Sequence, residues 1–405
     1  MNTVALPPAS PSSSSWWGGR VVVLAVVLPL VYALFGVTWM GFVPLMPEVT
    51  GALGVDKKDG TLLITVISMA KSIVPILTGL IAARLGMRRT LLSAGVLIVL
   101  GGAAPWVSDY SLAVLVRFVL GVGGAMWVTV MGSVVLAELP ADKRPVANAV
   151  NGIAVNAGVI AALALTLPLA AWVGPRVALS IASVLSALCL VALVGVGEIG
   201  GAAKPASLSD TLKAYAATLK VKTTWLLAIA FCGPLALYLV LNTFLGAHLE
   251  QSFGVARAAS MRWLSFMNLW GIPASIGAGL WLVKKPDHTR LLLVLSAVLL
   301  PTGVAAAVLV PTDGARAVAF AVAGFGTFLP VSPLITAMQK APGQTPARLG
   351  MIFGTMFAVT YLVSAAVPTW VGGAVEAGTP LQTALLFSAL LGLTPAVGLG
   401  LLRAR

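Results

Sequence analysis

The chain has 405 residues, of which 59% are hydrophobic and only 9% are charged. A soluble domain carries about 25% charged residues, so this composition excludes a water-soluble fold and requires burial of most side chains in lipid or against other helices. The net charge of +13 is spread among apolar runs without a separate basic segment, which argues against a nucleic-acid-binding protein.

Residues 1–20 form a polar tail that is rich in proline and serine and carries no charge before Arg20. The apolar run that follows is far longer than the roughly 7–15 residues of a signal-peptide core. We therefore expect this run to be the first membrane-spanning helix and not a cleavable signal.

Apolar runs long enough to cross a membrane follow one another along the rest of the chain. A hydrocarbon layer about 30 Å thick requires about 20 helical residues. Most connections are short, so consecutive helices are expected to be antiparallel neighbours. Twelve such runs lie near residues 21–47, 61–83, 90–107, 111–136, 145–173, 176–197, 225–249, 258–283, 290–311, 315–339, 347–373 and 379–402.

One connection, residues 198–224, is longer and more polar than the others. It separates an N-terminal bundle, residues 21–197, from a C-terminal bundle, residues 225–405. Ser207 to Asp210 fits a capping box that opens a helix, and apolar residues recur behind it at helical spacing. We expect an interfacial amphipathic helix on the cytoplasmic side, with a flexible linker as the alternative.

The distribution of lysine and arginine predicts the orientation, because cytoplasmic loops of membrane proteins carry an excess of both. If the N-terminus is cytoplasmic, 17 of the 25 basic residues fall on the inside, and the opposite orientation would invert this bias. Both termini are therefore predicted to be cytoplasmic. The 17 residues are Arg20, Arg84, Arg88, Arg89, Lys143, Arg144, Lys204, Lys213, Lys220, Lys222, Lys284, Lys285, Arg290, Lys340, Arg348, Arg403 and Arg405.

The two halves resemble each other when the chain is shifted by 200 residues. Gly54-Val55 then falls on Gly254-Val255, and Gly79-Leu80 falls on Gly279-Leu280. A repeat of six helices returns the chain to the same side, so the two bundles would be related by an axis along the membrane normal, with the substrate site between them near the midplane.

Two motifs resemble signatures of the major facilitator superfamily. The loop after the second run reads Gly79-Leu-Ile-Ala-Ala-Arg84-Leu-Gly86-Met-Arg88-Arg89, similar to Gly-x-Leu-Ala-Asp-Arg-x-Gly-Arg-Lys/Arg. The fourth run carries Arg117-Phe-Val-Leu-Gly121-Val-Gly123, similar to Arg-x-x-x-Gly-x-Gly. The resemblance covers the whole chain. It implies a secondary transporter with two pseudo-symmetric bundles of six transmembrane helices, an all-α membrane protein.

The resemblance also assigns roles and shows departures. It implies a gating role for the loop residues Gly79, Arg84, Gly86, Arg88 and Arg89. Ala83 stands where the family has aspartate, which puts the family's cytoplasmic latch in doubt. The Gly-x-x-x-Gly-Pro signature of drug/proton antiporters is absent from the fifth run, which reads Asn151-Gly-Ile-Ala-Val-Asn156-Ala-Gly158.

Lys71 is a candidate substrate-binding residue because it lies about ten residues, or ~15 Å, from either end of its helix. A lysine side chain cannot snorkel that far, and an ionisable group at this depth is expensive. All twelve acidic residues lie outside the central parts of the spanning runs. We predict that Lys71 faces a central cavity and binds an anionic group; a structural lysine bonded to helix carbonyls or a neighbouring dipole is the alternative.

Other polar residues in the middle of spanning runs are weaker candidates. Arg117 lies about six residues from the outer end of its helix, where snorkelling is possible, and its place in the family signature favours a cavity or gating role. Arg262 is expected to be interfacial. The resemblance places the first and seventh helices along the cavity, and interhelical hydrogen bonding is the alternative for each amide. The predicted substrate contacts, besides Lys71 and Arg117, are Thr38, Asn151, Asn242 and Tyr361.

The sequence lacks a phosphate-binding loop, a Cys/His cluster and a nucleophile–base pair, so ATP-driven transport, a metal, a cofactor and an enzymatic activity are not expected. The favoured function is transport of a small solute, an anion or organic acid, in a bacterial inner membrane by a monomer. The alternatives are a drug/proton antiporter and a non-transporting membrane sensor.

Overall fold

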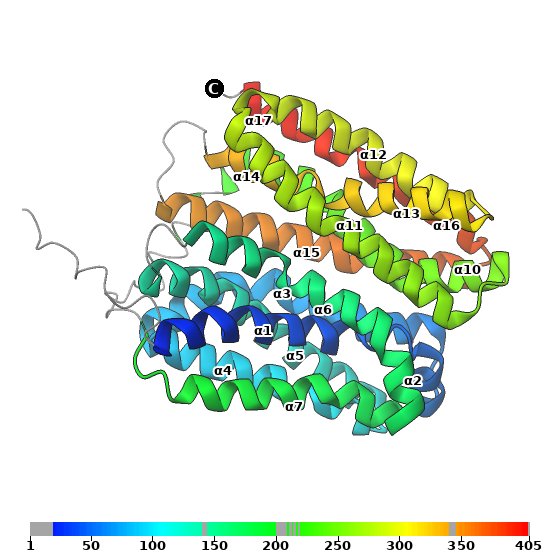
Figure 1. Ribbon diagram of the computed structural model, residues 1–405, viewed down its shortest axis with the longest axis horizontal. Coiled ribbons are helices and arrows are strands. Elements are labelled where there is room, and N and C mark those ends of the chain that lie inside the picture. The colour runs from blue at the N-terminus through cyan, green and yellow to red at the C-terminus, as the bar shows by residue number, and fades with distance from the viewer. Residues whose placement is uncertain are drawn as a thin grey trace, which may run out of the picture.

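A computed structural model of the chain describes residues 19–139, 144–199, 219–339 and 346–403, together with residues 209, 213, 216 and 217. Within these residues the regular structure is entirely helical. The helices run roughly parallel to one another and form two bundles side by side, one from the N-terminal half and one from the C-terminal half (Figure 1). The start of α1 and helix α17 lie at the same end of the molecule (Figure 1).

The N-terminal bundle contains six long helical segments and one short helix. The short helix, α2, is closed by Gly54 at φ 66°. The elements are α1 (Gly19–Met40), α2 (Met46–Leu53), α3 (Lys57–Leu85), α4 (Met87–Leu100) with its continuation η1 (Gly101–Trp106), α5 (Tyr110–Glu138), α6 (Arg144–Val173) and α7 (Pro175–Val194).

The C-terminal bundle repeats this order with more interruptions. Its first spanning segment contains a π-helical turn, η2, and its short helix α10 is closed by Gly254 at φ 64°. The elements are α9 (Lys222–Val240), η2 (Leu241–Leu245), α10 (Gly246–Phe253), α11 (Arg257–Lys284), η3 (Pro286–His288), α12 (Thr289–Leu309), α13 (Asp313–Phe328), α14 (Val331–Gln339), α15 (Pro346–Glu376), α16 (Leu381–Ala389), η4 (Leu390–Gly398) and α17 (Leu399–Arg403).

Corresponding helices have corresponding neighbours in the two bundles. Helix α1 packs against α6 and α7, and α9 packs against α15 and η4; α5 packs against α3 and α4, and α13 packs against α11 and α12. Gly54 and Gly254, which the 200-residue shift aligns, both end a short helix in the left-handed conformation that glycine adopts without strain. The repeat is therefore visible both in the packing and in the caps.

Eleven helices in the described part of the chain are long and apolar enough to cross a membrane. Helix α3 is not one of these eleven, but its 29 residues are ~43 Å long and it packs between α5 and α15. The predicted fold class, an all-α membrane protein with twelve helices in two pseudo-symmetric bundles, is confirmed. The bundles meet where α3 packs against α15 and where α6 packs against α11.

The predicted connection at residues 198–224 lies largely outside the described residues, as do most of the polar tail at residues 1–20 and Lys340 of the basic loops. The domain boundaries that we placed on these segments stay predictions. The six described residues from Leu219 to Thr224 end a turn and enter α9, which begins at Lys222.

Candidate functional site

Three aromatic side chains lie along one face of α1. Tyr32, Phe35 and Trp39 are spaced at i, i+3 and i+7, which brings side chains onto one face of a helix. All three are buried, and the Tyr32 and Phe35 rings stack with an interplanar angle of 2°. The Phe35 ring packs against Gly124 of α5. Any larger residue at that position would clash, because a Cβ there would lie 2.2 Å from the ring.

Lys71 of α3 extends its ammonium group into this row of rings. The Nζ atom lies 4.9 Å from the centre of the Phe35 ring and 4.7 Å from that of Trp39. It donates a hydrogen bond of 3.3 Å to the Tyr32 hydroxyl, and the side chain is only 1% exposed. The electron-rich ring faces attract the ammonium, with contributions of up to about 2 kcal/mol each when the pair is shielded from water.

The opposite bundle supplies the fourth ring. Tyr361 of α15 places its ring centre 4.7 Å from Lys71 Nζ, and its phenol lies close to that of Tyr32. Among the described residues no carboxylate forms an ion pair with Lys71. We call the rings of Tyr32, Phe35, Trp39 and Tyr361 the aromatic box.

Arg117 of α5 is completely buried, and it is held in a different way. Its Nη1 and Nη2 atoms donate to the backbone carbonyls of Thr38 and Trp39 at 2.7 and 2.6 Å. Its Nε atom donates to the carbonyl of Leu63 at 2.8 Å, and the Phe42 ring centre lies 4.1 Å from the guanidinium. Three of its donor atoms are therefore bonded to backbone.

The end of α1 explains why a cation is stable there. The last four carbonyls of a helix have no partner within it, and the end carries a partial negative charge. Val37 and Met40 bond to amides of the following turn, and Arg117 takes the other two carbonyls. Arg117 thus holds the break between α1 and α2, which makes it a positioning group; its predicted gating role is not tested by this geometry.

A second polar group lies where α6 meets α11. Asn268 of α11 donates to the Asn242 side chain at 2.6 Å, and Asn156 of α6 donates to the Asn268 carbonyl at 2.9 Å. The Tyr238 hydroxyl lies 3.4 Å from the Asn156 side chain. We call Asn156, Asn242 and Asn268 the asparagine cluster. Asn242 belongs to the π-helical turn η2, a feature that is frequent at functional sites.

The two groups approach each other through tyrosines. Tyr238, which contacts the asparagine cluster, also lies near Tyr32 and Tyr361 of the aromatic box. Both groups combine side chains from the two bundles, as expected for a site that alternating access rearranges. The aromatic box joins α1 and α3 to α15, and the asparagine cluster joins α6 to η2 and α11.

The structure therefore brings together only some of the predicted contacts. Lys71 and Tyr361 meet in the aromatic box, and Asn242 lies in the asparagine cluster. The Thr38 hydroxyl bonds to its own helix at Leu34, and its carbonyl holds Arg117. Asn151 is buried in α6, five residues or ~7.5 Å before Asn156.

The sequence reasoning missed Tyr32, Phe35 and Tyr238. The i, i+3, i+7 spacing of aromatic residues in the first spanning run was the signal that could have identified two of them. Arg316, near the start of α13, is also buried at 2% exposure, although the sequence gives no sign of this; it bonds to Asp313 and lies beside the Phe253 and Trp263 rings.

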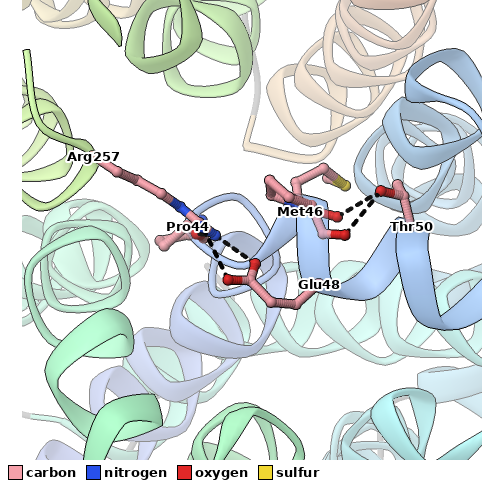
Figure 2. A network of polar contacts seen from close by, with 6 residues as sticks. Pro44, Met46, Glu48, Thr50 and Arg257 are labelled. Carbon is pink, nitrogen blue, oxygen red and sulfur yellow. Dashed lines mark hydrogen bonds and ion pairs between the residues drawn. The ribbon is translucent and has the colours of Figure 1, made fainter. Parts of the chain in front are cut away.

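The bundles are also tied together at the end that carries α2 and α10. Arg257, at the start of α11, donates two hydrogen bonds to the Glu48 carboxylate of α2, at 2.9 and 2.5 Å, and another to the Pro44 carbonyl (Figure 2). The Arg257 guanidinium holds the pKa of the Glu48 carboxyl below its ordinary value. This pair closes the α2 end of the interface between bundles.

The predicted gating loop lies at the opposite end of the N-terminal bundle. Gly86 separates α3 from α4 at φ 82°, and Arg88 donates to the Val194 carbonyl at the end of α7 at 2.7 Å. Arg84 and Arg89 are exposed, and Gly79 lies within α3. Among the described residues, Arg88 alone of these arginines hydrogen-bonds to the backbone, and its partner belongs to the same bundle.

No group of three or more His, Cys, Asp or Glu side chains lies close enough together to hold a metal ion, within the residues that the structure describes. The polar atoms of the aromatic box and the asparagine cluster are an ammonium, phenols and amides, which suit hydrogen bonding to an organic solute.

The sequence profile of the Major Facilitator Superfamily matches residues 28–400. A protein of Campylobacter jejuni, itself described as uncharacterized, is 23% identical over 233 residues, which make up 56% of this chain and 70% of that protein.

Several solved transporters share the fold. The nucleoside transporter NupG superposes with a TM-score of 0.72 at 17% identity, over 94% of this chain and 99% of that one. The peptide transporter POT, in complex with sulfate, superposes with a TM-score of 0.70 at 15% sequence identity, over 95% of this chain and 94% of that one. A bacterial homologue of the human lysosomal transporter Spinster, in an inward-facing and unoccupied conformation, superposes with a TM-score of 0.67 at 12% sequence identity. The match covers 97% of this chain and 95% of that one. At these identities the likeness concerns the fold.

Proposed function

This chain belongs to the major facilitator superfamily, and we propose that the solute it transports is a small anion or organic acid whose acidic group binds Lys71. The observation that carries the proposal is the placement of a buried ammonium between the two bundles, with ring faces and one phenol as its partners in place of a carboxylate. The solved relatives are named for nucleosides and peptides, so the acid class is inferred from Lys71 and not from them.

Ring faces stabilise the ammonium but leave its charge without a counterion. A carboxylate partner would be attracted by Coulomb interaction in a low-dielectric site, which is stronger than the same interaction in water. Cation–π contacts of about 0.5–2 kcal/mol each are weak enough for a solute to replace. If Lys71 formed a buried ion pair with a protein carboxylate, breaking that pair to bind a solute would cost several kcal/mol. The ring contacts of Lys71 do not impose this cost.

The other predicted contacts take supporting roles in this proposal. Tyr361 leaves Lys71 when the bundles separate, and Asn242 with Asn151 contacts the part of the solute distant from the acid. Arg117 and the Thr38 carbonyl keep the α1 break in place. The loop residues Gly79, Arg84, Gly86, Arg88 and Arg89 adjust as the bundles move. The transporter acts as a monomer in a bacterial inner membrane with both termini in the cytoplasm.

The test compares Lys71→Ala with Lys285→Ala, an exposed lysine outside the site. The thermal midpoint of each purified protein is measured with acetate, lactate, succinate and benzoate, and with the cations ethidium and tetraphenylphosphonium. We expect at least one carboxylate to stabilise the wild type and the Lys285→Ala protein, and none to stabilise a monodisperse Lys71→Ala protein. Stabilisation by carboxylates that persists in Lys71→Ala, or stabilisation by the cations alone, would refute the proposal.

The aromatic box itself favours a second candidate, export of amphipathic organic cations. Ring faces attract any cation of suitable size, and removal of the resident ammonium would leave them free for a ligand. Under this alternative the Lys71→Ala protein binds tetraphenylphosphonium more tightly than the wild type does. The same measurement therefore separates the two functions.

A further inference from the structure

We propose that the transported acid carries a planar aromatic ring, so that an aromatic carboxylate is the substrate class of the site. This inference rests on the proposed function, because it takes the acid at Lys71 as given and adds what surrounds it. Its observations are the position of Tyr361 in the aromatic box and a buried hydroxyl beside Lys71 that has no hydrogen-bond partner in the part of the chain that the structure describes.

Tyr361 shows the shape of the space that a ligand would fill. Its ring lies beside the Lys71 ammonium, and its phenol lies close to that of Tyr32. It stacks with Phe357 of the same helix at 6.0 Å and 29°. Tyr361 is partly exposed and Phe357 is 39% exposed, whereas the three rings on α1 are all at most 4% exposed.

This difference in burial identifies the movable wall of the aromatic box. Tyr32, Phe35 and Trp39 belong to the same bundle as Lys71, so they stay with the ammonium when the bundles separate. Tyr361 belongs to the other bundle and moves away. The space left is that of a planar ring with one oxygen at its edge, bounded by aromatic side chains that prefer offset or edge-to-face contacts with another ring.

Ser68 provides the second part of the recognition. Its hydroxyl is fully buried and has no hydrogen-bond partner among the described residues, although buried polar groups are nearly always paired. It precedes Lys71 by three residues on α3, which places the two side chains next to each other on the helix surface. A carboxylate has two oxygens, and the ammonium of Lys71 with the Ser68 hydroxyl would serve both.

The probe pair is benzoate and cyclohexanecarboxylate, which carry the same charge on six-membered rings and differ in aromaticity. Dissociation constants are measured by calorimetry on the purified full-length protein. We expect benzoate to bind at least tenfold more tightly than cyclohexanecarboxylate to the wild type. Phe35→Leu, which keeps an apolar side chain of similar reach, should reduce this ratio to threefold or less.

Ser68→Ala is compared with Ser183→Ala, because Ser183 of α7 is also buried and unpaired but belongs to a helix outside the site. Ser68→Ala should weaken benzoate binding about three- to tenfold, and Ser183→Ala should leave it unchanged. Equal loss in both variants would refute the role of Ser68.

The outcomes separate this inference from the proposed function. Equal affinity of the wild type for the two acids, with loss of both in Lys71→Ala, overturns the aromatic class and leaves the acid proposal standing. Benzoate binding that is unaffected in Lys71→Ala overturns both. Failure of benzoate to bind, while an aliphatic acid binds through Lys71, overturns the aromatic class alone.

Discussion

Lys71 and Arg117 lie on neighbouring helices of one bundle and are hidden from solvent to the same degree, at 1% and 0% exposure, but their partners differ in kind. Arg117 is held by three backbone carbonyls, and Lys71 by rings and one phenol. Trp39 contacts both cations, since its ring faces Lys71 and its carbonyl accepts from Arg117.

The comparison separates a structural cation from one that is available to a ligand. Carbonyls at a helix end need a donor, so Arg117 and the α1 break depend on each other. Ring faces need no donor, so the aromatic box is a stable arrangement of side chains without its lysine. Burial alone does not distinguish these cases, whereas the identity of the partners does.

Arg117→Ala has the largest expected effect on stability. It leaves the carbonyls of Thr38 and Trp39 at the end of α1 without their donor, and each unsatisfied buried group costs about 1–3 kcal/mol. We expect a low yield of monodisperse protein and a thermal midpoint about 10 °C below that of the wild type. Arg290→Ala, at an exposed position, is the control. A thermal midpoint of Arg117→Ala equal to that of the wild type would contradict the assignment of Arg117 as a structural cation.

Asn268→Leu tests whether the asparagine cluster resembles Arg117 or Lys71. It breaks the 2.6 Å bond to Asn242 and leaves that amide partly unpaired, at a cost of about 1–3 kcal/mol. The double variant Asn242→Leu/Asn268→Leu should be no less stable than the single one, because both partners are then apolar. Additive losses in thermal unfolding would show that the two amides act independently.

Lys71→Met should leave stability within about 1 kcal/mol of the wild type, or raise it. Replacing a buried charge that has no carboxylate partner by an apolar side chain of similar length is neutral or stabilising. The thermal midpoint of the ligand-free protein measures this. Carboxylate-induced stabilisation should be absent in the same sample. A large drop in the ligand-free midpoint would place Lys71 with Arg117 as a structural cation.

Glu48→Gln has the smallest expected effect, because an exposed ion pair contributes about 1 kcal/mol or less. The pair with Arg257 holds the pKa of Glu48 below its ordinary value of 4.5, so its contribution is present above that value and is lost as the pH falls below it. The difference in midpoint between wild type and Glu48→Gln should therefore be constant near neutral pH and vanish in acid. A difference that grows on acidification would contradict this assignment.

The sequence predicted the architecture well because membrane-spanning helices are long, apolar and regularly placed. The repeat, the loop after α3 and the depth of Lys71 follow from the positions of a few residues along those helices. The aromatic box was not predicted, because it depends on which face of α1 meets α3. It also depends on α15, whose Tyr361 follows Lys71 by 290 residues in the chain. The sequence places Arg117 in a helix, but its carbonyl partners follow from the exact point at which α1 ends.

Close contact between α1 and α6 has a consequence for how substrate preference can change during evolution. A Cβ at Gly158 would lie 1.9 Å from the Ala33 carbonyl oxygen, and a Cβ at Gly36 would lie 2.5 Å from that of Val155. The two backbones therefore touch, and α1 has little freedom to shift when one of its rings is replaced. Tyr361 and Phe357 are less buried than the rings on α1, so we expect variants with new substrate preferences to arise on α15 more readily than on α1.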